Sequence, residues 1–81
     1  MRFVWPDSAR AELRAIGRDD ALRILHSLTG YAETGNGDIK ALQGEWQGYF
    51  RLRVGDYRVI FSIAGEELTI SRIGHRSDVY R

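Results

Sequence analysis

The sequence contains no cysteine, which excludes a disulfide framework, a thiolate metal site and a cysteine nucleophile. No apolar run approaches the ~20 residues that a membrane span needs, and the N-terminus turns polar too early for a secretory signal. With 43% hydrophobic and 28% charged residues, the composition is that of a folded globular protein. We therefore expect one soluble, cytoplasmic domain that covers residues 1–81 and contacts no membrane.

Lysine is also nearly absent, because Lys40 is the only lysine among the twelve basic residues. The others are arginines, whose planar guanidinium group suits bidentate contact with phosphate. The charges are unevenly placed along the chain. Residues 49–81 hold six basic and four acidic side chains, whereas residues 1–48 hold six basic and seven acidic ones. We expect any anion-binding surface in the C-terminal half.

The N-terminal part predicts a strand and then a helix. Met1–Trp5 is β-branched and aromatic, and the strand that it predicts ends at Pro6. Asp7 or Ser8 can cap a helix that begins there and ends at Gly17. The apolar side chains of this helix recur at spacings of four and three residues: Ala9, Leu13 and Ile16.

A second helix is predicted directly after the first. Asp19 or Asp20 caps it, and Gly30 ends it. Its apolar face comprises Ala21, Leu22, Ile24, Leu25 and Leu28. Two helices joined by so few residues form an antiparallel helical hairpin. Residues 31–45 are rich in glycine and are predicted to be a loop.

The apolar period changes to two after Trp46, which predicts a three-stranded antiparallel meander over residues 49–54, 57–63 and 68–73. Gly55 and Asp56 form a two-residue type II′ turn between the first two of these strands. The third strand ends before Gly74, and residues 75–81 are predicted to form a C-terminal tail. The fold class is therefore α+β, in the order β-α-α-β-β-β, with the helices on one face of the sheet.

The turn register directs several arginines to the face opposite the helices. It pairs Arg53 with Arg58, and directly opposed cations destabilise a hairpin unless an anion neutralises them. Arg51 lies on the same face, and Arg76 can converge on it after the third strand. The aromatic rings of Tyr49 and Tyr80 are expected nearby. Arginines interleaved with aromatics are typical of an RNA site, whereas each arginine alone equally fits a solvated strand.

Other candidate residues carry weaker signals. His75 adjoins Arg76, and an imidazole can transfer protons near neutral pH. The two histidines are far apart in the sequence and fit no metal-binding spacing, so neither a metal nor a cofactor is expected. Trp5 and Trp46 are interpreted as residues of the core or its edge.

The run LQGEWQGYFRLRVGDYRVIFSI, followed by LTISRIGHRSDVYR, resembles the RelE/ParE-type toxins of bacterial type II toxin–antitoxin systems. The resemblance covers essentially the whole chain and favours the RelE-like branch, which cleaves messenger RNA on the ribosome. It implies catalytic roles for Arg51, Arg53, Arg58, Arg76 and Tyr80, to which imidazole chemistry adds His75. The expected RNA-binding residues are Arg51, Arg53 and Arg58, together with the nearby ring of Tyr49.

One departure from that branch affects the chemistry. The best-known RelE-type sites carry lysine at the places of Arg51 and Arg53. Because arginine does not lose its proton in proteins, His75 would have to act as the base if a lysine base is required.

The resemblance also implies partners and leaves alternatives open. It implies a cognate antitoxin protein, and operator DNA that is bound only through that antitoxin. The alternatives are a ParE-like inhibitor of DNA gyrase, an inactive antitoxin-binding module, and a small RNA-binding domain that does not cleave. The set of Arg58, Arg76 and Tyr80 separates them, because the nuclease needs these residues and the gyrase inhibitor does not.

Overall fold

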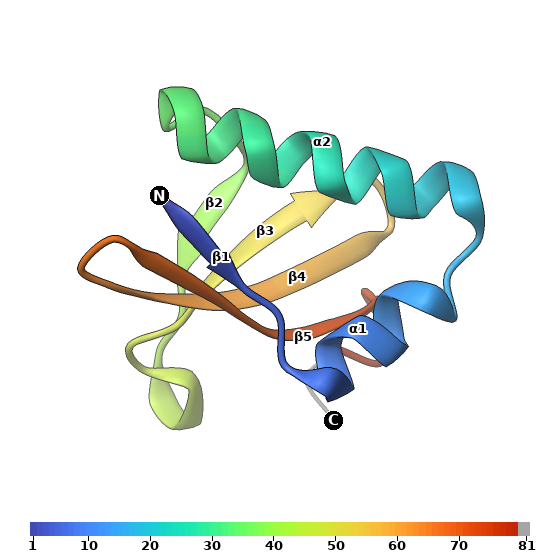
Figure 1. The fold of residues 1–81 in the computed structure, drawn as a ribbon. Coiled ribbons are helices and arrows are strands. Elements are labelled where there is room, and N and C mark those ends of the chain that lie inside the picture. The colour runs from blue at the N-terminus through green and yellow to red at the C-terminus, as the bar shows by residue number, and fades with distance from the viewer. Residues whose placement is uncertain (80–81) are drawn as a thin grey trace.

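A computed structural model describes residues 1–79 and shows two helices on one face of a five-stranded sheet (Figure 1). The elements in chain order are β1 (Arg2–Val4), α1 (Asp7–Arg14), α2 (Arg18–Thr34), β2 (Ile39–Ala41), the 3₁₀ turn η1 (Gly44–Trp46), β3 (Phe50–Val54), β4 (Tyr57–Ala64) and β5 (Glu67–His75). The strand order is β1-β5-β4-β3-β2, in which β1 runs parallel to β5 and the other neighbours are antiparallel. The α+β class is confirmed, and the predicted elements occur in the predicted order, with the additional strand β2 before the meander. No helix of this described part is long and apolar enough to span a membrane.

The core lies between α1, α2 and the inner face of the sheet. Ala9 of α1 and Ile24 and Leu28 of α2 are buried against alternate residues of the meander, led by Phe61, which is fully buried. Leu13 and Ile16 pack at the edge of this core. The predicted bounds of this helix are wrong, because Pro6 and not Asp7 or Ser8 is the cap residue, and α1 ends at Arg14, before Ile16. Each helix packs mainly on the sheet, α1 against β5 and α2 against β3.

The second helix is longer than the sequence predicted. Gly30 does not end α2, which continues to Thr34 and is closed by Gly35 in the left-handed conformation, with φ of 77°. The prediction that Asp19 or Asp20 caps this helix is also wrong, because Gly17 is the cap residue and both acids lie in the first turn. Leu22, which we placed on the apolar face, is 43% exposed.

Residues 31–45 are not a single loop. They contain the last turn of α2, the edge strand β2 and the start of η1. A three-residue strand carries too little alternation to be detected in the sequence, so β2 was missed. The last strand also extends beyond Gly74, to His75, and the tail therefore begins at Arg76.

The side chain of Glu12 protects the open edge of β5. Past its short pairing with β1, β5 has no neighbouring strand on that side within the described residues. Glu12 of α1 accepts a hydrogen bond from the backbone N–H of Ile73, at 2.9 Å. This bond satisfies a donor that an edge strand would otherwise leave free.

The position of Gly30 inside α2 gives a test of the fold. A methyl group at this site meets no atom within 4 Å, so we expect Gly30→Ala to raise the free energy of unfolding by about 0.5–1 kcal/mol through helix propensity. Urea denaturation measures the change. The matched control Gly35→Ala should lower it by about 1–2 kcal/mol, because φ is positive there. Destabilisation by Gly30→Ala would contradict a continuous helix.

Candidate functional site

The face of the sheet opposite the helices, hereafter the outer face, carries the predicted arginines. The register of β3 and β4 pairs Val54 with Tyr57, Arg53 with Arg58, and Arg51 with Ile60, as the turn predicts. Gly55 has φ of 59°, and no residue other than glycine has a positive φ in the described part, which agrees with a type II′ turn. The opposed pair of Arg53 and Arg58 is therefore confirmed.

The neighbouring strands extend this basic surface. On β5, Gly74 pairs with Arg58 and Arg72 pairs with Ile60, while on β2 Lys40 pairs with Arg51. Directly paired residues of antiparallel strands share a face. Basic side chains from four strands thus start from the outer face: Lys40, Arg51, Arg53, Arg58 and Arg72.

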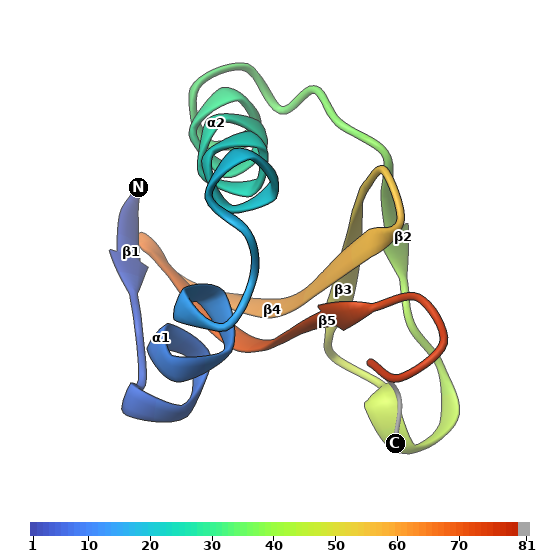
Figure 2. The same cartoon turned by 90° about the vertical axis from the view of Figure 1, so that its right-hand side faces the viewer.

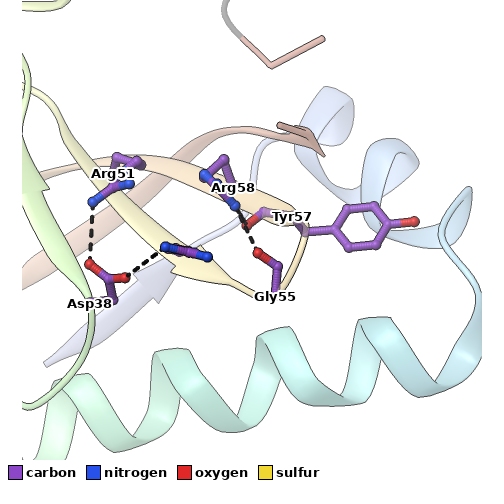
Figure 3. Close-up of polar contacts among 6 residues, drawn as sticks. Asp38, Arg51, Gly55, Tyr57 and Arg58 are labelled. Carbon is purple, nitrogen blue, oxygen red and sulfur yellow. Dashed lines mark hydrogen bonds and ion pairs between the residues drawn. The ribbon is translucent and has the colours of Figure 1, made fainter. Parts of the chain in front are cut away.

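Asp38, just before β2, lies against two of these arginines (Figure 3). Its Oδ1 is 3.3 Å from an Nη of Arg51, and its Oδ2 is 4.0 Å from an Nη of Arg53. The backbone N–H of Arg53 donates to the carbonyl oxygen of Asp38 at 3.0 Å, which fixes the loop beside β3. Asp38 is 54% exposed, so these contacts are worth at most about 1 kcal/mol each after solvent screening.

The two arginines that share Asp38 differ in their surroundings. The side chain of Arg51 is only 17% exposed, and its buried Nε has no hydrogen-bond partner among the described residues. The side chain of Arg53 is 55% exposed. Arg51 is therefore held against the sheet, whereas Arg53 reaches solvent.

Arg58 is held by the backbone and not by an acidic group. One Nη donates to the carbonyl oxygens of Gly55 and Tyr57, at 2.9 and 3.0 Å, and Figure 3 shows the side chain turned toward Gly55. No carboxylate of residues 1–79 forms an ion pair with it. The Arg58 guanidinium group therefore keeps donors and a full charge for an external anion.

The end of β5 brings two further predicted residues to the same end of the sheet. His75 pairs with Tyr57, and its ring contacts the Tyr57 ring edge-on at 5.9 Å between centroids. Arg76 donates its backbone N–H to the carbonyl oxygen of Asp56, at 2.8 Å. Both side chains are exposed, and both lie beside the β3–β4 turn. The Nδ1 of His75 is 3.0 Å from the hydroxyl of Ser77.

The tail after β5 is attached to the outer face by Val79. Val79 and Ile60 are buried, yet neither belongs to the core beneath the helices. Val79 packs directly over Gly74, where even a Cβ atom would come within 3.5 Å of its Cα. The carbonyl oxygen of Val79 accepts a hydrogen bond from Arg72 at 3.0 Å. Figure 2 shows the tail on the side of the sheet away from the helices.

Aromatic residues of the β2–β3 connection lie near this tail. Trp46 meets Tyr49 edge-to-face, with ring centroids 5.4 Å apart, and the Arg72 guanidinium lies 5.4 Å from the Trp46 ring centroid. Our interpretation of Trp46 as a core residue is wrong, because the loop holds it against Arg72 and outside the core cluster. Trp5 does pack against the core, as predicted.

The structure brings the three strand arginines of the predicted site together, because the register joins Arg51, Arg53 and Arg58 on the outer face. His75 and Arg76 reach the same turn, but His75 pairs with Tyr57, so its side chain starts from the helix-facing side of the sheet. Tyr49 lies apart from that turn, beside Trp46. Tyr80 lies outside the described residues. No group of three or more histidine, aspartate or glutamate side chains within residues 1–79 forms a metal-binding cluster.

Asp38 was not predicted as a site residue. Its nearness to Arg51 and Arg53 depends on β2, and β2 was not predicted. The signal that could have indicated it is chemical: a strand face with several opposed cations needs a counterion within the chain or from a ligand.

Residues 3–80 match the family described as the ParE toxin of the type II toxin–antitoxin system parDE. The chain belongs to this toxin family. Over 43 residues it is 37% identical to Toxin RelE3 of Methanocaldococcus jannaschii. That match covers 53% of this chain and about half, 48%, of the relative.

Solved toxin structures share the fold. The RelB–RelE antitoxin–toxin complex from Methanococcus jannaschii is similar at a TM-score of 0.77 and 22% identity, covering 95% of this chain and 94% of that chain. The toxin–antitoxin complex RelBE2 from Mycobacterium tuberculosis is similar at a TM-score of 0.65 and 26% identity, covering 93% and 96%. The YoeB/ParE toxin from Agrobacterium tumefaciens is similar at a TM-score of 0.78 and 17% identity, covering 93% and 98%. The chain is therefore a type II toxin with the RelE/ParE fold.

The attachment of the tail by Val79 can be tested. We expect Val79→Ala to lower the free energy of unfolding by about 1–2 kcal/mol and to speed amide exchange at residues 76–79, because a buried side chain that holds the tail is shortened. Hydrogen exchange measures the second effect. Val4→Ala is the control: it lies on β1 beside Thr69 of β5, away from the end of β5 where the tail begins, and it should leave exchange at the tail unchanged. If amide exchange at residues 76–79 were equally fast in both variants, Val79 would not be what attaches the tail to the outer face.

Proposed function

We propose that this toxin is an endoribonuclease that cleaves messenger RNA on the ribosome. One observation carries the proposal: Arg53 and Arg58 are directly opposed on the outer face, and only Arg53 has a carboxylate nearby. Because opposed cations destabilise a hairpin, this arrangement favours a protein whose ligand is an anion. A phosphodiester of RNA supplies that charge and matches the fork geometry of guanidinium groups.

The proposed reaction needs charge stabilisation and proton transfer and draws on no metal. The ribose 2′-oxygen attacks the adjacent phosphorus, and the bond from phosphorus to the 5′-oxygen breaks. The 2′-hydroxyl loses a proton and the leaving 5′-oxygen gains one, giving a 2′,3′-cyclic phosphate and a free 5′-hydroxyl. Arg58, with Arg53 or Arg51, would bind the non-bridging oxygens and stabilise the charge that develops on them.

The proton steps and the orientation of the RNA fall to the other residues of the site. His75 would assist removal of the 2′ proton, and Arg51 would stabilise the charge on the 2′-oxygen. Arg76 would neutralise the charge on the leaving oxygen, which takes its proton from water. Tyr80 would stack on or orient a base, and Tyr49 would contact RNA beside Trp46. A site with one exposed imidazole and no other conventional base benefits from a ribosome that positions the RNA.

An antitoxin partner forms part of the same proposal. Two of the similar solved structures are complexes of a toxin with its antitoxin. We expect the antitoxin of this chain to lay an acidic segment across the outer face, where basic side chains gather. Operator DNA would then be bound through the antitoxin.

The match to the ParE toxin family favours a second candidate function, inhibition of DNA gyrase. The arginine pair separates the two candidates, because a gyrase inhibitor has no need of a phosphate-binding centre. Primer extension on messenger RNA, run beside a gyrase supercoiling assay, distinguishes them. Loss of supercoiling with intact messenger RNA would reject the nuclease.

Arg58 is the first residue to test. We expect Arg58→Ala to relieve growth arrest and to lower the cleavage rate by about 10²–10³, because a preorganised donor to the transition-state charge is lost. Arg76→Ala should act in the same direction. Arg14→Ala, an exposed arginine of α1, is the matched control and should remain toxic. Full toxicity of both site variants, with the fold intact by circular dichroism, would refute this site.

His75 is tested separately by His75→Gln, which keeps a polar side chain but cannot exchange protons near neutral pH. If the imidazole takes the 2′ proton, the single-turnover cleavage rate on programmed ribosomes falls by about 10²–10⁴. His26→Gln, an exposed histidine on α2, is the control. An unchanged rate in His75→Gln would show that the His75 imidazole does not take the 2′ proton.

A further inference from the structure

Asp38 is the one acidic side chain of the described residues that forms an ion pair on the outer face with the proposed site arginines. Its two carboxylate oxygens lie 3.3 Å from Arg51 and 4.0 Å from Arg53. A carboxylate between two guanidinium groups resembles a phosphate in charge and in the direction of its acceptors. The free protein thus already holds an anion of its own beside the opposed arginines.

The position of Asp38 does not depend on these ion pairs. Its backbone carbonyl oxygen accepts a hydrogen bond from Arg53 at 3.0 Å, and β2 begins at the next residue, Ile39. Backbone hydrogen bonding at the edge of the sheet therefore positions the Asp38 side chain beside the arginines. Because it is 54% exposed, it can swing into solvent when another anion arrives.

Asp38 forms no ion pair with Arg58. Arg58 opposes Arg53 across the hairpin, yet its contacts are to the carbonyl oxygens of Gly55 and Tyr57. A phosphate that bridges Arg53 and Arg58 gains a donor that Asp38 does not occupy. The two anions therefore compete for Arg53 and Arg51 but not for Arg58.

We propose that Asp38 is a specificity-determining residue, an internal counterion that a phosphate of the RNA must displace from Arg51 and Arg53. This inference rests on the proposed function, because it assigns the displaced group at the same site. The carboxylate keeps Arg51 and Arg53 oriented in the free protein. It also lowers their affinity for any external anion that does not bind Arg58 as well. The predicted ligand is the sugar–phosphate backbone of a single-stranded nucleic acid, with phosphates that contact Arg53 on one strand of the hairpin and Arg58 on the other.

Asp38→Asn tests the inference, because it removes the charge and retains the size and the backbone acceptor. The probe is a short single-stranded oligonucleotide of 2′-deoxyribose, which binds without being cut. We expect Asp38→Asn to bind it about three- to tenfold more tightly at low salt, with a salt dependence steeper by about 0.7 in log–log slope, the value for one more phosphate contact on a single strand. Fluorescence anisotropy at several salt concentrations measures both.

The control Asp7→Asn makes the same change in net charge on α1, away from the outer face. Its affinity and slope should match those of the unaltered protein, and thermal unfolding checks that both variants fold. Equal binding by Asp38→Asn and Asp7→Asn, or weaker binding by Asp38→Asn, would overturn the internal counterion. If the unaltered protein also cleaves messenger RNA, the proposed function survives that result. If neither the unaltered protein nor Asp38→Asn binds the probe or cleaves RNA, both proposals fail.

Discussion

The pairing register of β3 and β4 is the constraint on which the rest of the structure depends. Side chains alternate between the two faces of a strand, so a shift by one residue would exchange the faces completely. In the observed register Leu52 and Val59 enter the core while Arg53 and Arg58 face outward. The turn at Gly55 and Asp56 fixes this register locally, and the burial of Phe61 opposes any slip. The stability of the domain and the assembly of its basic face thus have one cause.

The outer face of the sheet is partly covered by the tail that follows β5. Ile60 projects from the centre of the outer face, where a bare isoleucine would be exposed among arginines. Val79 is buried on this same face, and its carbonyl oxygen is bonded to Arg72. The packing of Val79 over Gly74 brings residues 76–79 back over the end of β5. The positions of residues 76–79 therefore depend on the outer face and not on the main core.

Much of this architecture was predictable because it follows from local rules. The period of two placed Arg51 and Arg53 on one face, and the glycine turn gave the partner of each, including the opposed Arg58. The helical spacing of Ala9 and Leu13 located the core face of α1. These features depend on neighbours within a few residues along the chain, and the sequence reports such neighbours directly.

The features that were missed depend on distant contacts. Gly30 is a poor helix former, yet α2 runs through it because Leu28 and Tyr31 pack against the core on either side. The three residues of β2 are a strand only because β3 lies beside them. Asp38 could not be placed near Arg51 without that pairing. Trp46 was assigned to the core or its edge, but the segment that holds it against Arg72 has no periodic signal from which its contacts could be predicted.

The edge strand β2 has a consequence for how the surface behaves in time. It has three residues and one neighbour, so its hydrogen bonds are among the easiest to open in a native protein. Each opening carries Asp38 away from the arginines and leaves the positive potential of the sheet uncompensated for as long as the strand is detached. The electrostatic field that an approaching polyanion meets therefore fluctuates with the fraying of three residues at the margin of the sheet.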